Sequence, residues 1–188
     1  PSWHVCYRCA DMSGLSPSNA RHADEPLAIV CLAGDPTLMG TVDGDPRETQ
    51  RAAQRSAKAI ATLVREGFRL VIVPAGGAAI DRELIRNEET STKLPPSTMS
   101  EAAAAAQGAV GVRLEAAVRN ALRQEGLDRD VATLVTPILV STDDPAFETP
   151  TRPVGPLLSA WRAKEIARTR SVHLVEEAGR GWRRVVAL

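Results

Sequence analysis

The sequence predicts an α/β fold in which helices cover both faces of a mostly parallel sheet. Short segments of consecutive apolar residues alternate along the chain with longer segments of helical period. Continuous apolar runs are typical of strands that are buried on both faces, as in parallel sheets. Strands that alternate with helices favour the same arrangement. The length of 188 residues suits one compact domain, and we find no internal repeat.

The first predicted elements are a strand, a loop and a helix, in that order. Residues 27–32 (LAIVCL) form an apolar run that ends in the turn sequence AGDP at 33–36. After a second turn, DGDP at 43–46, residues 47–66 place small and apolar residues at helical spacing. Gly67 supplies the stop signal for this helix.

A second strand is predicted to lead through a glycine turn into two more helices. The strand LVIV (70–73) meets the turn PAGG (74–77), and a helix follows over 78–87. A longer helix is expected to begin with Ser100 as its cap and to run to about Gln124.

The C-terminal third is predicted to be mixed. Residues 131–140 (VATLVTPILV) are rich in β-branched residues, and Pro137 indicates an edge strand, a bend or a bulge rather than an uninterrupted central strand. A loop is expected at 141–156 and a helix at 158–168. Two short strands are expected near 172–175 and 183–187.

Composition excludes several classes of protein. The 23 Lys and Arg residues balance the 23 Asp and Glu residues, so no overall charge attracts the chain to nucleic acid or to an anionic membrane. Aromatic residues make up 3% of the chain, which argues against base stacking on single-stranded nucleic acid. No apolar run approaches the roughly 20 residues of a membrane span, and the N-terminus lacks the order of a signal peptide. We therefore expect a cytoplasmic protein that binds neither nucleic acid nor a membrane.

Residues 1–26 show no assignable period and are interpreted as an irregular N-terminal extension. Within them, Cys6 and Cys9 have the spacing of metal ligands or of a redox pair. His4 or His22 could complete a zinc site with these cysteines and Cys31. A zinc ion would explain how such an extension becomes ordered. The other readings are redox chemistry and ordinary reduced thiols.

Three loops are expected to lie close together at one edge of the sheet. In open α/β sheets, ligands bind in the loops beyond the carboxyl ends of the strands. This rule brings together Gly34 and Asp35, Gly76 and Gly77, and the loop 141–156. The alternative readings are that the glycines form tight turns without a ligand and that Asp35 caps the following segment.

The loop sequence FETPTRPVGP (147–156) places three prolines and a glycine around Arg152. So many prolines are incompatible with a helix or a central strand, because proline fixes φ and has no backbone N–H to donate. One reading is structural: Arg152 pairs with Asp143, Asp144 or Glu148 and only pins the loop.

Several segments together resemble carbamate kinase, a member of the amino-acid-kinase superfamily. They occur in the order LAIVCLAGDP (27–36), FRLVIVPAGGAA (68–79), AAQGAVGVRL (105–114), and VATLVTPILVSTDDPAFETPTRPVGP (131–156) followed by EEAGRGWRRVV (176–186). The third and the last are the specific ones. The resemblance covers roughly residues 27–188, and it implies a three-layer α/β/α sandwich like the N-terminal half of that fold. Residues 27–188 are accordingly interpreted as the half that binds the acyl substrate.

The resemblance also implies which residues contact a bound anion. Arg152 stands where the family has a lysine, and would be the catalytic cation if the protein is active. Arg180 matches the family's arginine-bearing turn. Solvent-facing charge remains the other reading of Arg180 and of the neighbouring Arg183.

The glycine loops depart from the family's pattern. The family has Gly-Gly-Asn after its first strand, where this chain has Ala33, Gly34 and Asp35. It has His-Gly-Asn-Gly-Pro-Gln after its second strand, where this chain has PAGGAA at 74–79. A carboxylate replaces an amide donor and other side-chain donors are gone, although Gly76 and Gly77 still offer backbone N–H groups.

These features lead to two hypotheses. The first is a catalytically degenerate carbamate-kinase-like protein that acts as a carbamoyl- or phosphate-binding, regulatory or assembly subunit. We expect it to form a homo-oligomer, or to bind a partner protein where the nucleotide-binding half would dock. The alternative is the substrate half of a split or truncated carbamate kinase. In that case ATP and Mg would be cofactors only with a nucleotide-binding partner, because the chain has no counterpart of that half. A further possibility is a different reaction on a carbamoyl compound without ATP.

Overall fold

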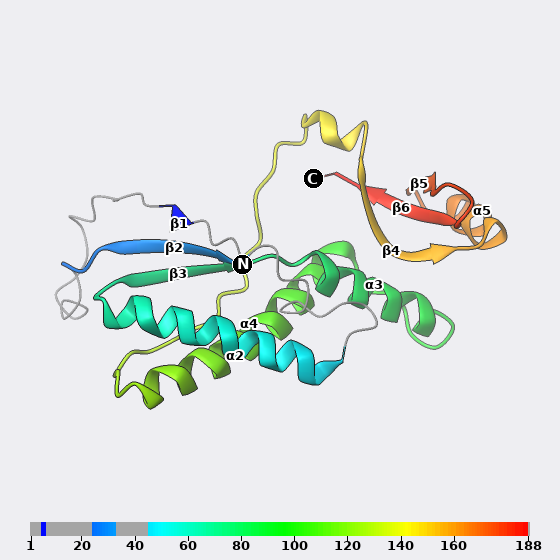
Figure 1. Ribbon diagram of the computed structural model, residues 1–188. Helices are drawn as coiled ribbons and strands as arrows, with labels where there is room; N and C mark the ends of the chain where they lie inside the picture. The colour runs from blue at the N-terminus through cyan, green and yellow to red at the C-terminus, as the bar shows by residue number, and fades with distance from the viewer. Residues whose placement is uncertain (1–4, 7–23, 33–44, 188) are drawn as a thin grey trace. The chain divides into compact units, whose positions relative to one another are not determined.

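The computed structural model describes residues 5–6, 24–32 and 45–187 (Figure 1). The described residues divide into two compact units. One comprises those within 1–76 and 108–134, and the other comprises 77–107 and 135–188. The helix α4 (Met99–Gln124) therefore contributes its first part to the second unit and the remainder to the first.

The first unit contains a three-stranded sheet in the order β1-β2-β3. β2 (Leu27–Leu32) and β3 (Arg69–Pro74) pair in parallel, with Leu27 opposite Arg69. This pair confirms the predicted α/β class and both predicted strands. The short strand β1 (Val5–Cys6) is antiparallel to β2 and lies within the segment that we expected to be wholly irregular.

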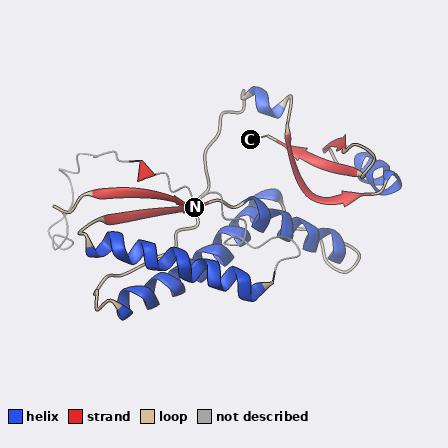
Figure 2. Cartoon of the chain, viewed as in Figure 1, coloured by secondary structure: helices blue, strands red, loops and turns tan. Residues whose placement is uncertain are grey.

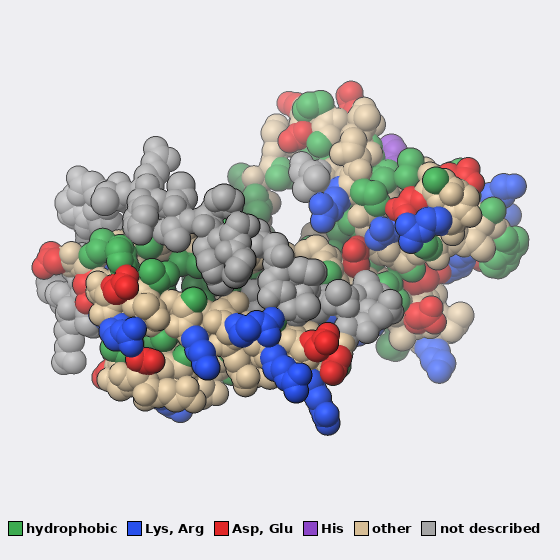
Figure 3. All heavy atoms as spheres, in the orientation of Figure 1, with side chains coloured by type: hydrophobic (Ala, Val, Ile, Leu, Met, Phe, Trp, Pro, Cys, Tyr) green, Lys and Arg blue, Asp and Glu red, His purple; other side chains and the backbone are tan. Residues whose placement is uncertain are grey.

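The helix α2 (Pro46–Arg65) begins where the sequence predicts, because Asp45 accepts a hydrogen bond from the backbone N–H of Arg47 at 2.8 Å. Pro46 occupies the first turn, where its missing N–H costs nothing. Lys and Arg side chains gather over α2 in the space-filling view (Figure 3). Its inward face consists of small and aliphatic residues that are almost completely buried: Ala52, Ala53, Ala57, Ile60 and Ala61.

The helix α4 starts with a capping box that Thr98 and Glu101 form, so the expected cap at Ser100 is wrong. The Thr98 hydroxyl accepts a hydrogen bond from the N–H of Glu101 at 3.2 Å, and the Glu101 carboxylate accepts one from the N–H of Thr98 at 2.6 Å. Further along, a Cβ atom on Gly111 would lie 2.1 Å from Cγ2 of Thr133. Glycine is therefore required there for close approach.

The segment 131–140 has no regular secondary structure, so of the three readings of Pro137 an edge strand and a bulge are not found among the described residues. Its apolar side chains are exposed instead, with Leu134 at 79%, Ile138 at 84% and Leu139 at 99%. A strand requires the backbone of a neighbour, and no described strand pairs with this segment.

The second unit contains the helix α3 (Gly77–Thr90) and an antiparallel sheet in the order β4-β6-β5 (Figure 2). Its strands are β4 (Arg152–Leu158), β5 (His173–Glu176) and β6 (Trp182–Val186). The helix α5 (Ala160–Thr169), capped by Ser159, connects β4 to β5, and a short 3-10 turn, η2 (Pro145–Phe147), precedes β4. The two short C-terminal strands were predicted, but β4 begins inside the segment that was expected to be a loop.

In the described part of the chain, no helix is both long enough and apolar enough to cross a membrane.

Candidate functional site

The N-terminus of α3 is one side of the candidate site. β3 ends at Pro74, Ala75 donates a hydrogen bond to the carbonyl of Leu32 at 3.1 Å, and the helix begins at Gly77 directly after Gly76. The first turn of α3 contains no acidic residue. Its backbone N–H groups and the positive end of the helix dipole therefore have no carboxylate of their own turn beside them.

Arg152 is the other side of the site, at the first residue of β4. A Cβ atom on Gly77 would lie 2.8 Å from a terminal nitrogen of the Arg152 guanidinium, so the cation lies directly against the start of the helix. The Arg152 side chain is exposed, and no described residue forms a hydrogen bond or an ion pair with it. The structure thus places next to a helix N-terminus a cation that has no partner among the described residues.

The structural reading of Arg152 required a carboxylate from its own loop. Asp144 instead accepts a hydrogen bond from the N–H of Ala146 at 2.8 Å and caps the turn η2. Among the described residues, neither Asp143 nor Glu148 pairs with Arg152. The guanidinium is consequently available for a ligand.

The position of β4 relative to α3 is set by hydrogen bonds to Gly155, three residues after Arg152. The Asp81 carboxylate accepts a hydrogen bond from the N–H of Gly155 at 2.8 Å, and Arg183 donates to the carbonyl of Gly155 at 2.8 Å. Arg183 also lies 3.6 Å from the second oxygen of Asp81. Gly155 has a φ of +76°, and an added Cβ would approach Leu84 to 3.3 Å, so glycine is required here.

Arg183 therefore links β4 to Asp81 of α3 and does not simply face solvent. Its side chain is 22% exposed, and it also pairs with Glu177 at 3.5 Å, while its Nε atom is buried without a partner. Asp81 is a residue that the sequence analysis missed. It lies 74 residues from Gly155 along the chain, and no local pattern indicates the contact.

Arg180 lies elsewhere in this unit. Arg152 pairs with Val186 at one end of the β4–β6 ladder, and Leu158 pairs with Trp182 at the other. Arg180 belongs to the turn that precedes Trp182, with a side chain that is 72% exposed and 4.0 Å from Glu177. The structure does not bring Arg180 to the end of the ladder that carries Arg152.

Several predicted site residues lie outside the described residues. These are Gly34, Asp35, His4, His22 and Cys9. The backbone of Cys6 pairs with Ile29 in the first sheet, and Cys31 is an exposed free cysteine. Within the described ranges, no three His, Cys, Asp or Glu side chains gather as metal ligands would. The zinc hypothesis thus remains a prediction.

Comparisons with known proteins agree with this architecture. No family model matches the chain. It is 33% identical over 160 residues to carbamate kinase from Pyrococcus horikoshii, a match that covers 84% of this chain and 51% of the relative. It is 35% identical over 160 residues to carbamate kinase from Latilactobacillus sakei, with 84% and 50% covered.

Solved structures give the same result. Carbamate kinase from Giardia lamblia bound to AMP-PNP superposes with a TM-score of 0.80 at 27% identity, over 88% of this chain and 52% of that structure. The chain thus spans about half the length of the relatives it matches. Over the aligned residues it is carbamate-kinase-like, corresponds to the N-terminal part of a carbamate kinase, and has the amino-acid-kinase fold.

Proposed function

We propose that this chain binds the anionic group of carbamoyl phosphate, or phosphate itself, as part of a carbamate-kinase-like protein. The observation that carries the proposal is the Arg152 guanidinium, which lies against Gly77 at the start of α3 and has no described residue as a partner. The match to carbamate kinases supports the choice of ligand, because it covers both residues.

The geometry suits an oxyanion for three physical reasons. The guanidinium of Arg152 offers a planar fork of N–H donors to a phosphate or carboxylate. The first turn of α3 offers backbone N–H groups and a partial positive charge. Pro153 follows Arg152 directly and restricts the backbone, so binding orders less of the strand. An anion here would neutralise a cation that otherwise has no described partner.

A binding, regulatory or assembly role is favoured over catalysis by these residues alone. The turn PAGGAA at 74–79 carries no side-chain donor. Phosphoryl transfer needs several charges around the transferred group, because negative charge is spread over its oxygens in the transition state. In the second unit the site offers Arg152 and backbone groups, which suffice to bind an anion.

Calorimetric titration of the purified chain with carbamoyl phosphate tests the proposal. We expect saturable binding that Arg152→Ala weakens at least about tenfold, which corresponds to about 1.4 kcal/mol. Arg180→Ala is the matched control, since it removes an exposed arginine from the opposite end of the ladder. Equal weakening in the two variants, or no heat in the unmodified chain, would rule out this site.

The second candidate function is phosphoryl transfer between ATP and carbamate, with Mg, in complex with a nucleotide-binding partner. It is favoured by the coverage, because the Giardia enzyme that was solved with AMP-PNP is about twice as long as the matched stretch. The test mixes this chain with the nucleotide-binding half of a related carbamate kinase and measures ATP formed from ADP and carbamoyl phosphate. Anion binding without ATP formation would retain the first function and reject the second.

The exposed segment around Ile138 and Leu139 supports a partner protein. These side chains are 84% and 99% exposed in a stretch without secondary structure. Large apolar side chains that are exposed together mark protein interfaces. We propose that this segment packs against a polypeptide equivalent to the part of the relatives that the chain does not match. Sedimentation with and without that polypeptide should show a complex that Ile138→Asp and Leu139→Asp abolish, whereas self-association of the chain alone would identify a second copy as the partner.

A further inference from the structure

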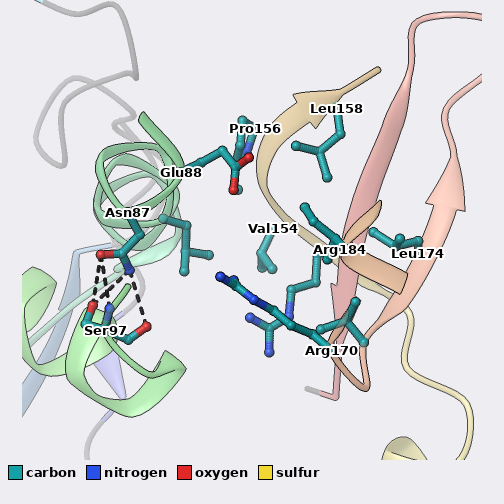
Figure 4. A pocket seen from close by; sticks show the side chains of 13 residues that line it. Asn87, Glu88, Ser97, Val154, Pro156, Leu158, Arg170, Leu174 and Arg184 are labelled. Atoms are coloured by element: carbon teal, nitrogen blue, oxygen red, sulfur yellow. Dashed lines mark hydrogen bonds between the residues drawn. The ribbon is translucent and has the colours of Figure 1, made fainter. Parts of the chain in front are cut away.

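The second unit contains a cavity of about 80 Å³ that the anion site does not use (Figure 4). The helices α3 and α5 and the antiparallel sheet supply its walls. Val154, Arg184 and Leu174 line it from the sheet, and the strand register places them side by side, since Arg184 pairs with both of the others. Arg170 lines it from the residue that follows α5. The sheet wall thus carries one cation between two apolar side chains, and Arg170 adds a second cation to the lining.

In the part of the chain that the structure describes, no carboxylate pairs with either arginine side chain. The guanidinium groups of Arg170 and Arg184 form no hydrogen bond or ion pair with any described residue. In Figure 4 their side chains run close together, with both guanidinium groups directed toward the side of the cavity that carries Asn87 and Ser97. Burial lowers the pKa of Arg184, and the nearby positive charge of Arg170 lowers it further. Two like charges in a partly buried cavity favour an anion between them.

The carboxylate in the cavity wall is already engaged. Glu88 accepts a hydrogen bond from Nε of Arg162 at 2.5 Å, and Arg162 also donates to Glu165 at 2.6 Å. Among the described residues that line the cavity, Glu88 is the one acidic side chain. The positive charge of Arg170 and Arg184 is therefore not matched within the cavity.

We propose that this cavity binds a small organic oxyanion, a carboxylate or phosphate attached to a short apolar group. Arg170 and Arg184 contact the oxyanion, and Val154 and Leu174 contact the apolar part. The hydroxyl of Ser97 and the amide of Asn87, which hydrogen-bond to each other at 2.8 Å, supply further polar contacts at the rim. The site is separate from the Arg152 site, since neither Arg152 nor Gly77 lines it.

The experiment uses the full chain carrying Arg152→Ala, so that the first anion site does not contribute. Two probes are titrated by calorimetry at constant ionic strength: isovalerate, which has a planar oxyanion with an apolar tail, and inorganic phosphate. Acetate is titrated as the control without the tail. We expect saturable binding of isovalerate with one site per chain and tighter than that of acetate, because the tail contacts Val154 and Leu174. If phosphate rather than isovalerate binds, the oxyanion is tetrahedral and the natural ligand is a phosphate ester.

Three charge-removing variants distinguish binding in the cavity from general attraction of anions to a positively charged surface. Arg170→Gln and Arg184→Gln should each weaken binding at least about tenfold. Arg168→Gln removes the same charge from the last turn of α5 and does not touch the cavity, so binding should change by less than about twofold. The proposal is overturned if neither probe binds saturably, or if Arg168→Gln weakens binding as much as Arg170→Gln.

Melting temperatures provide a second check, which does not use calorimetry. Without a probe, Arg170→Gln should melt at the same or a higher temperature, because it relieves repulsion between two cations. With a probe, the protein that retains both Arg170 and Arg184 should melt at a higher temperature than without it, whereas the melting temperature of Arg170→Gln should not rise. A lower melting temperature of Arg170→Gln without a probe would show that the pair stabilises the fold instead, and would contradict the inference.

Discussion

A terminal nitrogen of Arg152 lies 2.8 Å from the position that a Cβ atom on Gly77 would occupy. The two residues are 75 positions apart in sequence (152 − 77) and meet because Asp81 and Arg183 fix β4 against α3. The absence of a side chain at Gly77 is thus what allows the cation to reach the helix N-terminus. This contact leads to the first prediction.

Gly77→Ala should weaken carbamoyl phosphate binding several-fold and leave stability almost unchanged. The methyl group would displace the end of a flexible side chain rather than backbone, and alanine is a better helix former than glycine. Calorimetry and urea denaturation measure the two effects. In an Arg152→Ala background the same substitution should have no further effect on affinity, and additivity of the two losses would contradict the contact.

Gly111→Ala should destabilise the protein by about 1 to 3 kcal/mol, because the new methyl would lie 2.1 Å from Cγ2 of Thr133. Gly108→Ala in the same helix is the matched control. Nothing lies within 4 Å of its added Cβ, so this variant should gain about 0.5 to 1 kcal/mol. Urea denaturation gives both free energies of unfolding. Thr133→Ser should partly rescue Gly111→Ala, since it removes the Cγ2 atom.

Asp81→Ala should cost about 1 to 3 kcal/mol, because the N–H of Gly155 and the guanidinium of Arg183 both lose a partner. Asp81→Asn should cost less, since its amide oxygen can still accept from Gly155. Both variants should also weaken anion binding, because Arg152 is the first residue of β4 and moves with that strand. Arg180→Ala is the control and should change the free energy of unfolding by less than about 0.5 kcal/mol, because its side chain is exposed. A larger loss would contradict the conclusion that Arg183, and not Arg180, fixes β4 against α3.

The start of α4 should respond to pH through Glu101. The backbone N–H of Thr98, and then its side chain, lower the pKa of the Glu101 carboxyl below its ordinary value. A lowered folded pKa means that the capping interaction stabilises the protein above the unfolded pKa and is lost as the pH falls through the folded pKa. NMR titration of Glu101 should show this depressed midpoint, and Glu101→Gln should remove this part of the pH dependence of stability.

The control for this prediction distinguishes two possible caps. Thr98→Ala should raise the pKa of Glu101 and cost about 1 kcal/mol, whereas Ser100→Ala should leave that titration unchanged. If Ser100→Ala alone shifted the pKa of Glu101, Ser100 rather than Thr98 would be the cap of α4.

Much of the fold follows from local signals. β2 and α2 lie where apolar runs, turn residues and caps place them, because backbone hydrogen bonding and burial of one face are both encoded within a few turns of chain. The start of α4 is also encoded locally, because Thr98 and Glu101 have the spacing of a capping box. The order of segments also pointed to carbamate kinase, and the comparisons agree.

Pairing between distant segments was not predictable in the same way. The antiparallel order β4-β6-β5 is set by which strand edges meet, and the sequence showed only that two short strands were present. The β-branched residues of 131–140 left an edge strand open as one reading, yet no described strand pairs with them. Strand formation depends on a partner, so composition alone is not sufficient.

The sequence by itself determined the α/β class and most of the helices and strands. Only the tertiary structure decided what Arg152 contacts, that Asp81 and Arg183 position it, that Arg180 lies at the other end of the ladder, and that Arg170 and Arg184 share a cavity. The reason is physical. Secondary structure arises largely from neighbouring residues, whereas a binding site requires charges and backbone groups from distant segments to meet at hydrogen-bonding distance.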